Sequence, residues 1–485
     1  MNIERYLDAS AKALRNEVLP TLPASPARDQ VINCIRVLTR VAIALEKDPA
    51  AASALQNNPM LPAELRDAFR SDGRNPEPPF VGEDIVVDAG TAHGMNTAAR
   101  WIMSQPWVND AASTQTVKTL LAWDKQQRNA RLARMASAEA PPEANVTAAV
   151  SGAKLNEEVL QHYLQQKLSN PAFTVEQYRA LPGGRTRKTI VFRQTGQDDW
   201  PEWLVVQCDP PPGYHSFPGV SSQFPVIAYA HKGGKLKVPR PMLLELDAEH
   251  FGTPFMIVEK LPGSPPTEGI NFFAPPPPSE ALALDMARQL AALHSLPVGP
   301  VEKSIPVILP DASGWPGELE KLIGRIADEF QGPSLSVSAG FAWMKQHVGA
   351  VQNTVSLVHG DYLQHNLLVK DDAVSGILDW EGVRVGHPGE DLGYVRPMIE
   401  QMTSWDKFMD VYHGAGGPPF SRAEADYFTL RAYILMLTFI AHSKNGFESG
   451  SVDDIRSAEV GCSLAPLFVN CVATTMEKIL SATTP

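Results

Sequence analysis

The pattern of apolar and polar residues changes along the chain, and the change separates its predicted parts. Near the N-terminus, five apolar residues recur at the spacing of one helix face: Val31, Ile35, Leu38, Ala42 and Leu45. A second long helix is predicted over 114–135, so residues 1–135 are predicted to form an all-helical domain. Residues 136–150, rich in Ala, Pro and Glu, are predicted to be a linker.

Beyond the linker the pattern becomes strand-like. After an amphipathic helix around Tyr163, four apolar runs are typical of strands: 173–178, 189–192, 203–206 and 255–258. From Pro278 onward a helical spacing returns. We therefore predict a sheet-rich segment over 151–263 and a mainly helical segment over 264–485.

Three short apolar runs interrupt the second helical segment. Runs 356–358 and 367–369 read as strands on either side of a polar loop, and run 374–378 reads as a third strand. Polar residues stand where these runs begin and end. The loop and the strand ends are therefore the places where we look for chemistry.

The polar residues at these positions are Asp361, Asn366 and Asp379. In protein kinases, an Asp followed five residues later by an Asn supplies the base for the substrate hydroxyl and one Mg²⁺ ligand, and a later Asp binds Mg²⁺ against the phosphates. The three residues here have the same order and spacing. Either Asp alone reads as an ordinary turn residue, but the ordered set predicts a metal-dependent phosphoryl-transfer site.

Composition narrows the class of protein. With 44% hydrophobic and 20% charged residues, the 485-residue chain is typical of globular proteins, and its net charge of −12 argues against a nucleic-acid partner. The four cysteines form no C-x-x-C pair. No signal peptide and no run long enough to cross a membrane is found, so we expect a cytoplasmic protein with no membrane partner. The oligomeric state is left open.

A glycine turn lies between the first two predicted strands. Gly183 and Gly184 have no Cβ, so their backbone N–H groups can approach phosphate oxygens. An ordinary hairpin turn is the alternative interpretation.

Residues from about 150 to 445 resemble the aminoglycoside phosphotransferase/choline kinase family, and within it the kinase domain found alongside acyl-CoA dehydrogenases. Residues 1 to about 110 are similar to a small helical domain of uncharacterised function found with such kinases, for which we expect a scaffold or substrate-gating role. The resemblance to the kinases rests on the His359–Asn366 loop and on these motifs: Leu181-Pro182-Gly183-Gly184-Arg185-Thr186, Val238-Pro239-Arg240-Pro241, Gly252-Thr253-Pro254-Phe255, Leu293-His294-Ser295, Leu378-Asp379-Trp380-Glu381 and Gly386-His387-Pro388 through Asp391-Leu392.

The resemblance implies an α+β, bilobal protein-kinase-like fold, with a small mixed-sheet lobe and a large helical lobe, preceded by an all-α domain. It implies ATP- and Mg²⁺-dependent phosphorylation of a small-molecule hydroxyl, with a hydroxyacyl-CoA or a related hydroxy acid derivative as substrate. The implied roles are base for Asp361, support of the catalytic loop for His359, and Mg²⁺ ligation for Asn366 and Asp379. ATP would meet Gly183, Gly184, Arg185 and Arg187 at its phosphates, and Glu259, Lys260 and Leu261 at its adenine.

The sequence departs from the family in the sheet-rich lobe. Cys208, or Gln207 in a register shifted by one, stands where a strand Lys or Arg pairs with phosphates, and Gln223 stands where a helix Glu pairs with that cation. Alternatives therefore stay open: an aminoglycoside-type antibiotic kinase, or a catalytically impaired pseudokinase that only binds its ligands. The other cations that could serve the phosphates are Arg185, Arg187, Lys188, Lys232, Lys235 and Lys237.

Overall fold

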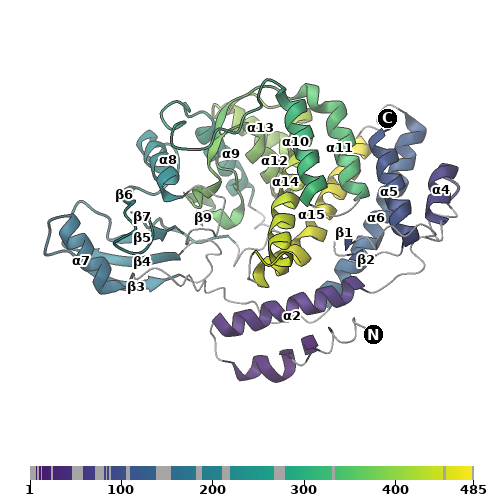
Figure 1. Ribbon diagram of the computed structural model, residues 1–485. Helices are drawn as coiled ribbons and strands as arrows, with labels where there is room; N and C mark the ends of the chain where they lie inside the picture. The colour runs from purple at the N-terminus through teal and green to yellow at the C-terminus, as the bar shows by residue number, and fades with distance from the viewer. Residues whose placement is uncertain are drawn as a thin grey trace. The chain divides into compact units, whose positions relative to one another are not determined.

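The computed structural model divides into two compact units (Figure 1). Unit 1 comprises residues 1–144, 310–352 and 422–485, and unit 2 comprises 145–309 and 353–421. The structure describes residues 7, 10–12, 14–22, 26–45, 58–70, 81–82, 85–86, 89–104, 110–137, 155–181, 188–209, 219–266, 279–329, 334–451 and 455–482. The predicted linker 136–150 lies almost wholly outside these residues, so the predicted domain boundaries remain predictions.

Unit 1 is built mainly of helices, as predicted for the N-terminal part. Its elements are η1 (Leu14–Val18), η2 (Leu19–Thr21), α2 (Pro26–Leu45), α4 (Ala63–Arg70), the short strands β1 (Val81–Gly82) and β2 (Ile85–Val86), α5 (Ala89–Ser104), α6 (Ala111–Ser137), α10 (Gly314–Glu329), α11 (Leu335–His347), η4 (Val348–Ala350), α14 (Arg422–Glu448) and α15 (Ile455–Ala482). Helix α15 packs against α14, α11, α6 and α2. Helices α10, α11, α14 and α15 lie in the segment predicted to form the C-terminal lobe. They thus pack in one unit with the N-terminal helices.

A buried polar cluster joins α6 to α11 inside unit 1. Arg128 pairs with Asp124 one helical turn earlier, and the hydroxyl of Ser336 donates to Oδ2 of Asp124 over 2.6 Å. Arg128 is 4% and Asp124 5% exposed. A buried charge pair of this kind persists because each charge has a partner.

Unit 2 contains a five-stranded sheet of strand order β3-β4-β5-β7-β6. The strands are β3 (Thr174–Ala180), β4 (Lys188–Thr195), β5 (Trp203–Cys208), β6 (Pro241–Glu245) and β7 (Phe255–Glu259). The fold class is confirmed, but the sheet is antiparallel throughout and the prediction of a mixed sheet is wrong. Strand β6 was not predicted from the sequence, because it begins at Pro241 and proline is unusual inside strands.

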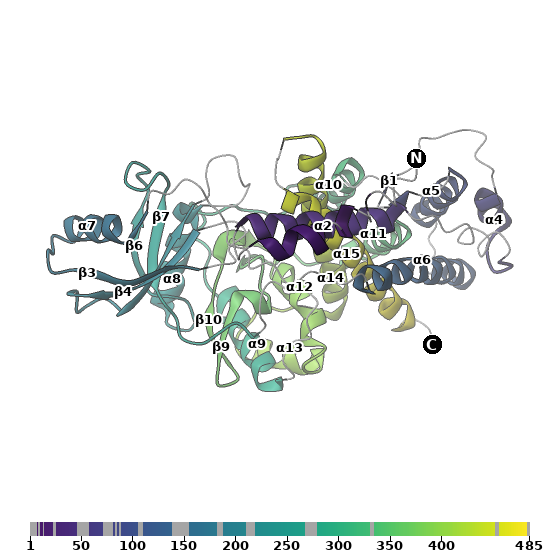
Figure 2. The same ribbon diagram turned by 90° about the horizontal axis from the view of Figure 1, so that it is seen from below.

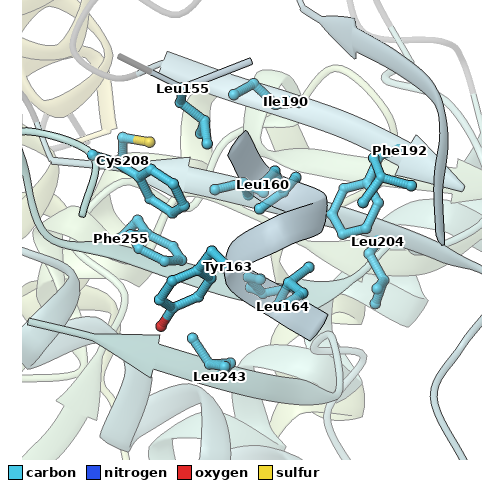
Figure 3. Packing of buried hydrophobic residues seen from close by; sticks show 14 of the residues in the cluster. Leu155, Leu160, Tyr163, Leu164, Ile190, Phe192, Leu204, Cys208, Leu243 and Phe255 are labelled. Carbon is cyan, nitrogen blue, oxygen red and sulfur yellow. The ribbon is translucent and has the colours of Figure 1, made fainter. Parts of the chain in front are cut away.

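Helix α7 (Glu157–Lys167) covers one face of this sheet (Figure 3). Leu160 and Leu164 are fully buried against alternate strand residues such as Phe192 and Leu204. Each buried side chain of this size contributes about 1.5–3 kcal/mol. The strand alternation therefore assigns one face of β4 and β5 to the α7 core and leaves the opposite face for other contacts.

The rest of unit 2 is mainly helical. It contains α8 (Val220–Gly233), α9 (Glu280–His294), β8 (Ser356–Val358), η5 (Gln364–Asn366), β9 (Leu367–Lys370), β10 (Ala373–Ile377), η6 (Trp380–Gly382), β11 (Arg384–Gly386), α12 (Gly389–Ile399) and α13 (Trp405–Gly414). Helix α13 packs on α9, and α9 in turn packs against β10 of the β9–β10 hairpin (Figure 2). Among the described residues, no helix combines the length and the apolar character that crossing a membrane requires.

Candidate active site

The side chains of Asp361 and Asn366 lie in direct contact. The Asn366 amide Nδ2 donates to Oδ2 of Asp361 over 2.8 Å and to the Asp361 carbonyl over 3.0 Å. Because the –NH₂ group has both acceptors, Oδ1 of Asn366 is left to accept or to ligate. The 3₁₀ turn η5 produces this contact by bringing residues five apart back together.

His365 is a second neighbour of Asp361 that the sequence interpretation missed. Its Nε2 lies 3.3 Å from Oδ2 of Asp361, and its side chain is 9% exposed against 35% for Asp361. Oδ2 is thus held by two donors, whereas Oδ1 of Asp361 has no hydrogen-bond partner among the residues that the structure describes. The four-residue spacing between Asp361 and His365, across a turn, was the feature of the sequence that could have predicted this contact.

Asp379 lies two residues after the end of β10. The N–H of Leu378 donates to the Asn366 carbonyl over 2.8 Å, so the segment that carries Asp379 lies beside Asn366. Asp379 itself has φ +59°, a left-handed conformation that Asp tolerates better than most residues. The structure thus brings together the segments that carry the three predicted residues, and the roles of these residues remain predictions.

His359 supports the loop that carries Asp361 from the interior of unit 2. It is fully buried, its Nε2 donates to the Leu378 carbonyl over 2.9 Å, and its Nδ1 accepts from the N–H of Asp361 over 3.3 Å. Burial lowers the pKa of His359 and favours the neutral ring. These two hydrogen bonds assign the proton to Nε2 and link the Asp361 loop to the Asp379 segment.

Asp391, in the first turn of α12, fixes the start of the loop. It accepts hydrogen bonds from the N–H groups of His359 (2.7 Å) and Gly360 (2.8 Å), and it contacts Nε2 of His294 at 3.1 Å. Burial alone raises the pKa of Asp391, but the hydrogen bond from His294 and the adjacent histidines hold it below its ordinary value. A carboxylate also suits a helix N-terminus.

Of the predicted adenine-binding residues, Glu259 is the last residue of β7, and Lys260 and Leu261 follow it. The N–H of Glu259 donates to the Arg240 carbonyl over 2.9 Å, and the N–H of Lys260 donates to the Trp203 carbonyl over 3.0 Å. Leu261 follows, in the segment that runs from the sheet to an isolated bridge between Ser264 and Val369. This segment therefore connects the sheet to β9, whose preceding residue is Asn366.

The predicted phosphate-binding residues of the glycine turn lie outside the described residues. They are Gly183, Gly184, Arg185 and Arg187. Lys188, which follows them, is opposite Cys208 in the sheet, and its Nζ lies 3.4 Å from the Leu155 carbonyl. It therefore points to the α7 face.

The register of β5 distinguishes the two candidates for the missing cation. Cys208 is 1% exposed within the α7 core, where burial raises the pKa of its thiol to about 12. Gln207 lies on the opposite face of the sheet, between Thr189 and Met256. Gln223, in α8, is 2% exposed. The candidates for the two positions of the usual ion pair, Gln207, Cys208 and Gln223, therefore include no cationic or acidic residue.

The donor set limits the metals that fit. Within the described part of the chain, no cluster of three or more His, Cys, Asp and Glu side chains could hold a metal by itself. Asn366 and Asp379 offer an amide oxygen and a carboxylate. These are hard oxygen donors, which suit Mg²⁺ when substrate phosphates and water complete its shell.

Comparison with known proteins decides the family. The sequence pattern of the phosphotransferase enzyme family matches residues 177–433, more than half of the chain. The chain belongs to this family. Asp361, Asn366 and Asp379 all lie within the matched residues.

Two curated relatives of this chain carry acyl-CoA dehydrogenase names. Acyl-CoA dehydrogenase family member 11 of Pongo abelii is 24% identical over 319 residues, which cover 58% of this chain and 38% of the relative. Family member 10 of Mus musculus is 27% identical over 170 residues, 32% of this chain and 15% of the relative. The chain thus spans well under half of the relatives that it matches.

Solved structures similar to this chain include proteins named as phosphotransferases. A putative aminoglycoside phosphotransferase from Ralstonia eutropha JMP134 is 18% identical with a TM-score of 0.49, covering 67% of this chain and 98% of its own. A spectinomycin phosphotransferase in complex with ADP and spectinomycin is 11% identical with a TM-score of 0.47, covering 67% and 99%.

Proposed function

We propose that this phosphotransferase moves the γ-phosphoryl group of ATP to the hydroxyl of a small molecule. The observation that carries the proposal is the arrangement of Asp361, whose Oδ2 is held by Asn366 and His365 while Oδ1 has no hydrogen-bond partner among the described residues. A carboxylate oriented in this way can accept the proton of an acceptor hydroxyl.

The other residues have distinct proposed tasks. Asn366 and Asp379 bind Mg²⁺, which when present neutralises charge on the phosphates. His359 keeps the Asp361 and Asp379 segments in register through its two hydrogen bonds. Most of the rate then comes from orientation and fixed charges, since phosphoryl transfer asks for little covalent chemistry from the protein.

For the nucleotide, we propose adenine contacts at Glu259, Lys260 and Leu261, and phosphate contacts at the glycine turn with Arg185 and Arg187. Gln207 and Gln223 replace both members of the usual ion pair. Their joint neutrality avoids leaving one buried charge without a partner, which is costly. It also leaves the phosphates dependent on Mg²⁺ and on the glycine turn.

For the acceptor, we propose a hydroxyacyl-CoA or a related hydroxy acid derivative. The similarity to two acyl-CoA dehydrogenase family members supports this choice. An aminoglycoside is the competing acceptor, and a polycationic ligand of that kind requires an acidic surface around Asp361.

The deciding experiment measures ADP release and phosphorylated product with Mg²⁺-ATP and three acceptor panels: hydroxyacyl-CoAs, aminoglycosides and free hydroxy acids. We expect turnover with a hydroxyacyl-CoA, and its loss in Asp361→Asn. Asp372→Asn is the matched control, because Asp372 is an exposed carboxylate in the β9–β10 turn. Absence of turnover and of nucleotide-induced stabilisation across all panels would instead identify a binding protein.

A further inference from the structure

Two consecutive acidic residues at the start of α12 face the two halves of the candidate site. Asp391 binds the backbone of His359 and Gly360 directly, just before Asp361. Glu390 reaches the other half through Arg384, whose guanidinium contacts the turn that follows Asp379. One helix start thus holds both segments.

Arg384 makes three hydrogen bonds in this arrangement. Its Nε and Nη2 donate to Oε2 of Glu390 over 3.1 and 2.6 Å, and its Nη1 donates to the Gly382 carbonyl over 2.7 Å. The other carboxylate oxygen of Glu390 accepts from the N–H of His387 over 3.1 Å. The side chains of Arg384 and Glu390 are 14% and 3% exposed, so solvent screens this pair little.

The guanidinium also contacts the Asp361 side of the site. Gly360 has φ +84°, and a Cβ at this position would overlap Nη1 of Arg384 and the Gly382 carbonyl oxygen. A Cβ on Gly382 would lie 2.9 Å from the His359 carbonyl oxygen. The two turns therefore meet backbone to backbone, with Nη1 of Arg384 against both.

We propose that Arg384 and Glu390 are positioning residues that set the separation between the base Asp361 and the metal ligand Asp379. Asp361 directly follows Gly360, and Asp379 lies three residues before Gly382. Neither Arg384 nor Glu390 touches the reacting groups. This role rests on the proposed kinase function, because it assigns a task to the same two carboxylates.

Arginine is required by this geometry. A planar guanidinium can donate to Glu390 from one edge while a further nitrogen donates to Gly382. The single ammonium of a lysine cannot span both acceptors in the same fixed directions. We therefore expect Arg384→Lys to lose activity. If the role of Arg384 were only electrostatic, lysine would replace it without loss.

The test compares Arg384→Gln, Arg384→Lys and Glu390→Gln with a second arginine–glutamate pair, at the C-terminal end of α12. Nε of Arg396 lies 2.8 Å from Oε1 of Glu400, with side chains 11% and 24% exposed, so Arg396→Gln is the control. For each variant we measure kcat, KM for the acceptor, the Mg²⁺ concentration for half-maximal rate, and Mn²⁺ binding with ADP by electron paramagnetic resonance.

We expect Arg384→Gln and Arg384→Lys to lower kcat about 100-fold, because a small misplacement of reacting groups costs about that much. The Mg²⁺ requirement and the Mn²⁺ dissociation constant should rise about tenfold, as for other residues that orient metal ligands. KM for the acceptor should change less than about twofold, since no substrate contact is lost. Arg396→Gln should leave all four quantities near wild type.

The proposal is overturned if Arg384→Lys matches wild type, or if a folded Arg384→Gln retains the wild-type kcat and Mg²⁺ requirement. Should Arg384→Gln not fold, the nearly isosteric Glu390→Gln decides by the same criteria. If wild type binds Mn²⁺ with ADP but turns over no acceptor, the proposed function fails, and weaker Mn²⁺ binding in Arg384→Gln still supports the positioning role. Wild type that binds no Mn²⁺ overturns both.

Discussion

The hydroxyl of Tyr412 lies 2.8 Å from Nδ1 of His294, whose Nε2 contacts Asp391 on the opposite side of the ring. The ionised Asp391 can only accept, so Nε2 of His294 carries a proton and donates it. Burial raises the pKa of Tyr412 and keeps its hydroxyl protonated. A line of hydrogen bonds therefore runs from α13 through α9 to the loop that carries Asp361.

Tyr412→Phe removes the outer donor of this line. We expect the free energy of unfolding to fall by about 1 kcal/mol, the usual contribution of one buried hydrogen bond. We also expect kcat to fall several-fold, because His294 then orients Asp391 less firmly. Urea unfolding and steady-state kinetics measure the two effects. Tyr427→Phe, at another tyrosine that is 1% exposed, is the control, and equal losses in both variants would remove the proposed link.

Gly360→Ala tests the close approach of the two turns. Gly416 has a similar φ of +93° but nothing within 4 Å of a built Cβ, so Gly416→Ala reports the conformational cost alone. That cost is about 1–2 kcal/mol. Gly360→Ala adds an overlap with Arg384 and Gly382, which raises the loss in unfolding free energy by about a further 1–3 kcal/mol. Similar unfolding free energies for the two variants would show that the turns can separate freely.

His365→Ala removes one of the two donors to Oδ2 of Asp361. We expect kcat to fall about tenfold with KM for the acceptor nearly unchanged, because general-base catalysis depends on the orientation of this carboxylate. His413→Ala, at an exposed histidine of α13, is the control. An unchanged kcat in His365→Ala would leave Asn366 as the only side chain, among the residues that the structure describes, that orients the proposed base.

Glu245→Gln tests the anchor between α7 and the sheet. The hydrogen bond from Tyr163 (2.6 Å), with the ion pair to Lys167 (2.9 Å), lowers the pKa of Glu245 to about 2. A lowered carboxyl pKa stabilises the fold above the unfolded-state value, and this stabilisation is lost as pH falls through the folded-state value. We expect Glu245→Gln to cost about 2 kcal/mol at pH 7.

The difference between wild type and Glu245→Gln should shrink as the pH falls from about 5 toward 2, which urea titrations across this range would measure. Glu249→Gln, at an exposed glutamate four residues beyond Glu245, provides the pH-matched control. If the difference in unfolding free energy stayed constant over the whole pH range, the ionised carboxylate of Glu245 would contribute nothing to stability.

The buried Asp124–Arg128 pair predicts strong non-additivity. Arg128→Leu or Asp124→Leu alone leaves one buried charge unpaired, which costs about 3–5 kcal/mol. The double variant should be more stable than the sum of the two losses implies. Chemical denaturation of the four proteins completes the cycle, and additive losses would refute a direct coupling between Asp124 and Arg128.

Some of this architecture was accessible from sequence because local patterns determined it. The spacing of Asp361, Asn366 and Asp379, together with the apolar runs around them, predicted three side chains at one point, and the structure brings their segments together. His365 was missed because a histidine inside a loop carries no periodic signal of its own.

Other features depended on contacts between distant residues. The pairing of Arg384 with Glu390 requires the position of α12 against β11, which no local pattern reports. Likewise, choosing between Gln207 and Cys208 required the register of β5 against β4. Residue alternation fixes the two faces of a strand, but only the neighbouring strand and α7 show which face is which.

The three separate segments of unit 1 have a consequence for the order in which the protein folds during synthesis. Helix α2 packs on α15, although nearly the whole of the described sequence lies between them. Every segment of unit 2 precedes α14, so the ribosome releases all of unit 2 before unit 1 has its last two helices. The residues proposed to bind nucleotide and metal can therefore assemble before α15 is available to cover the apolar faces of α2 and α6.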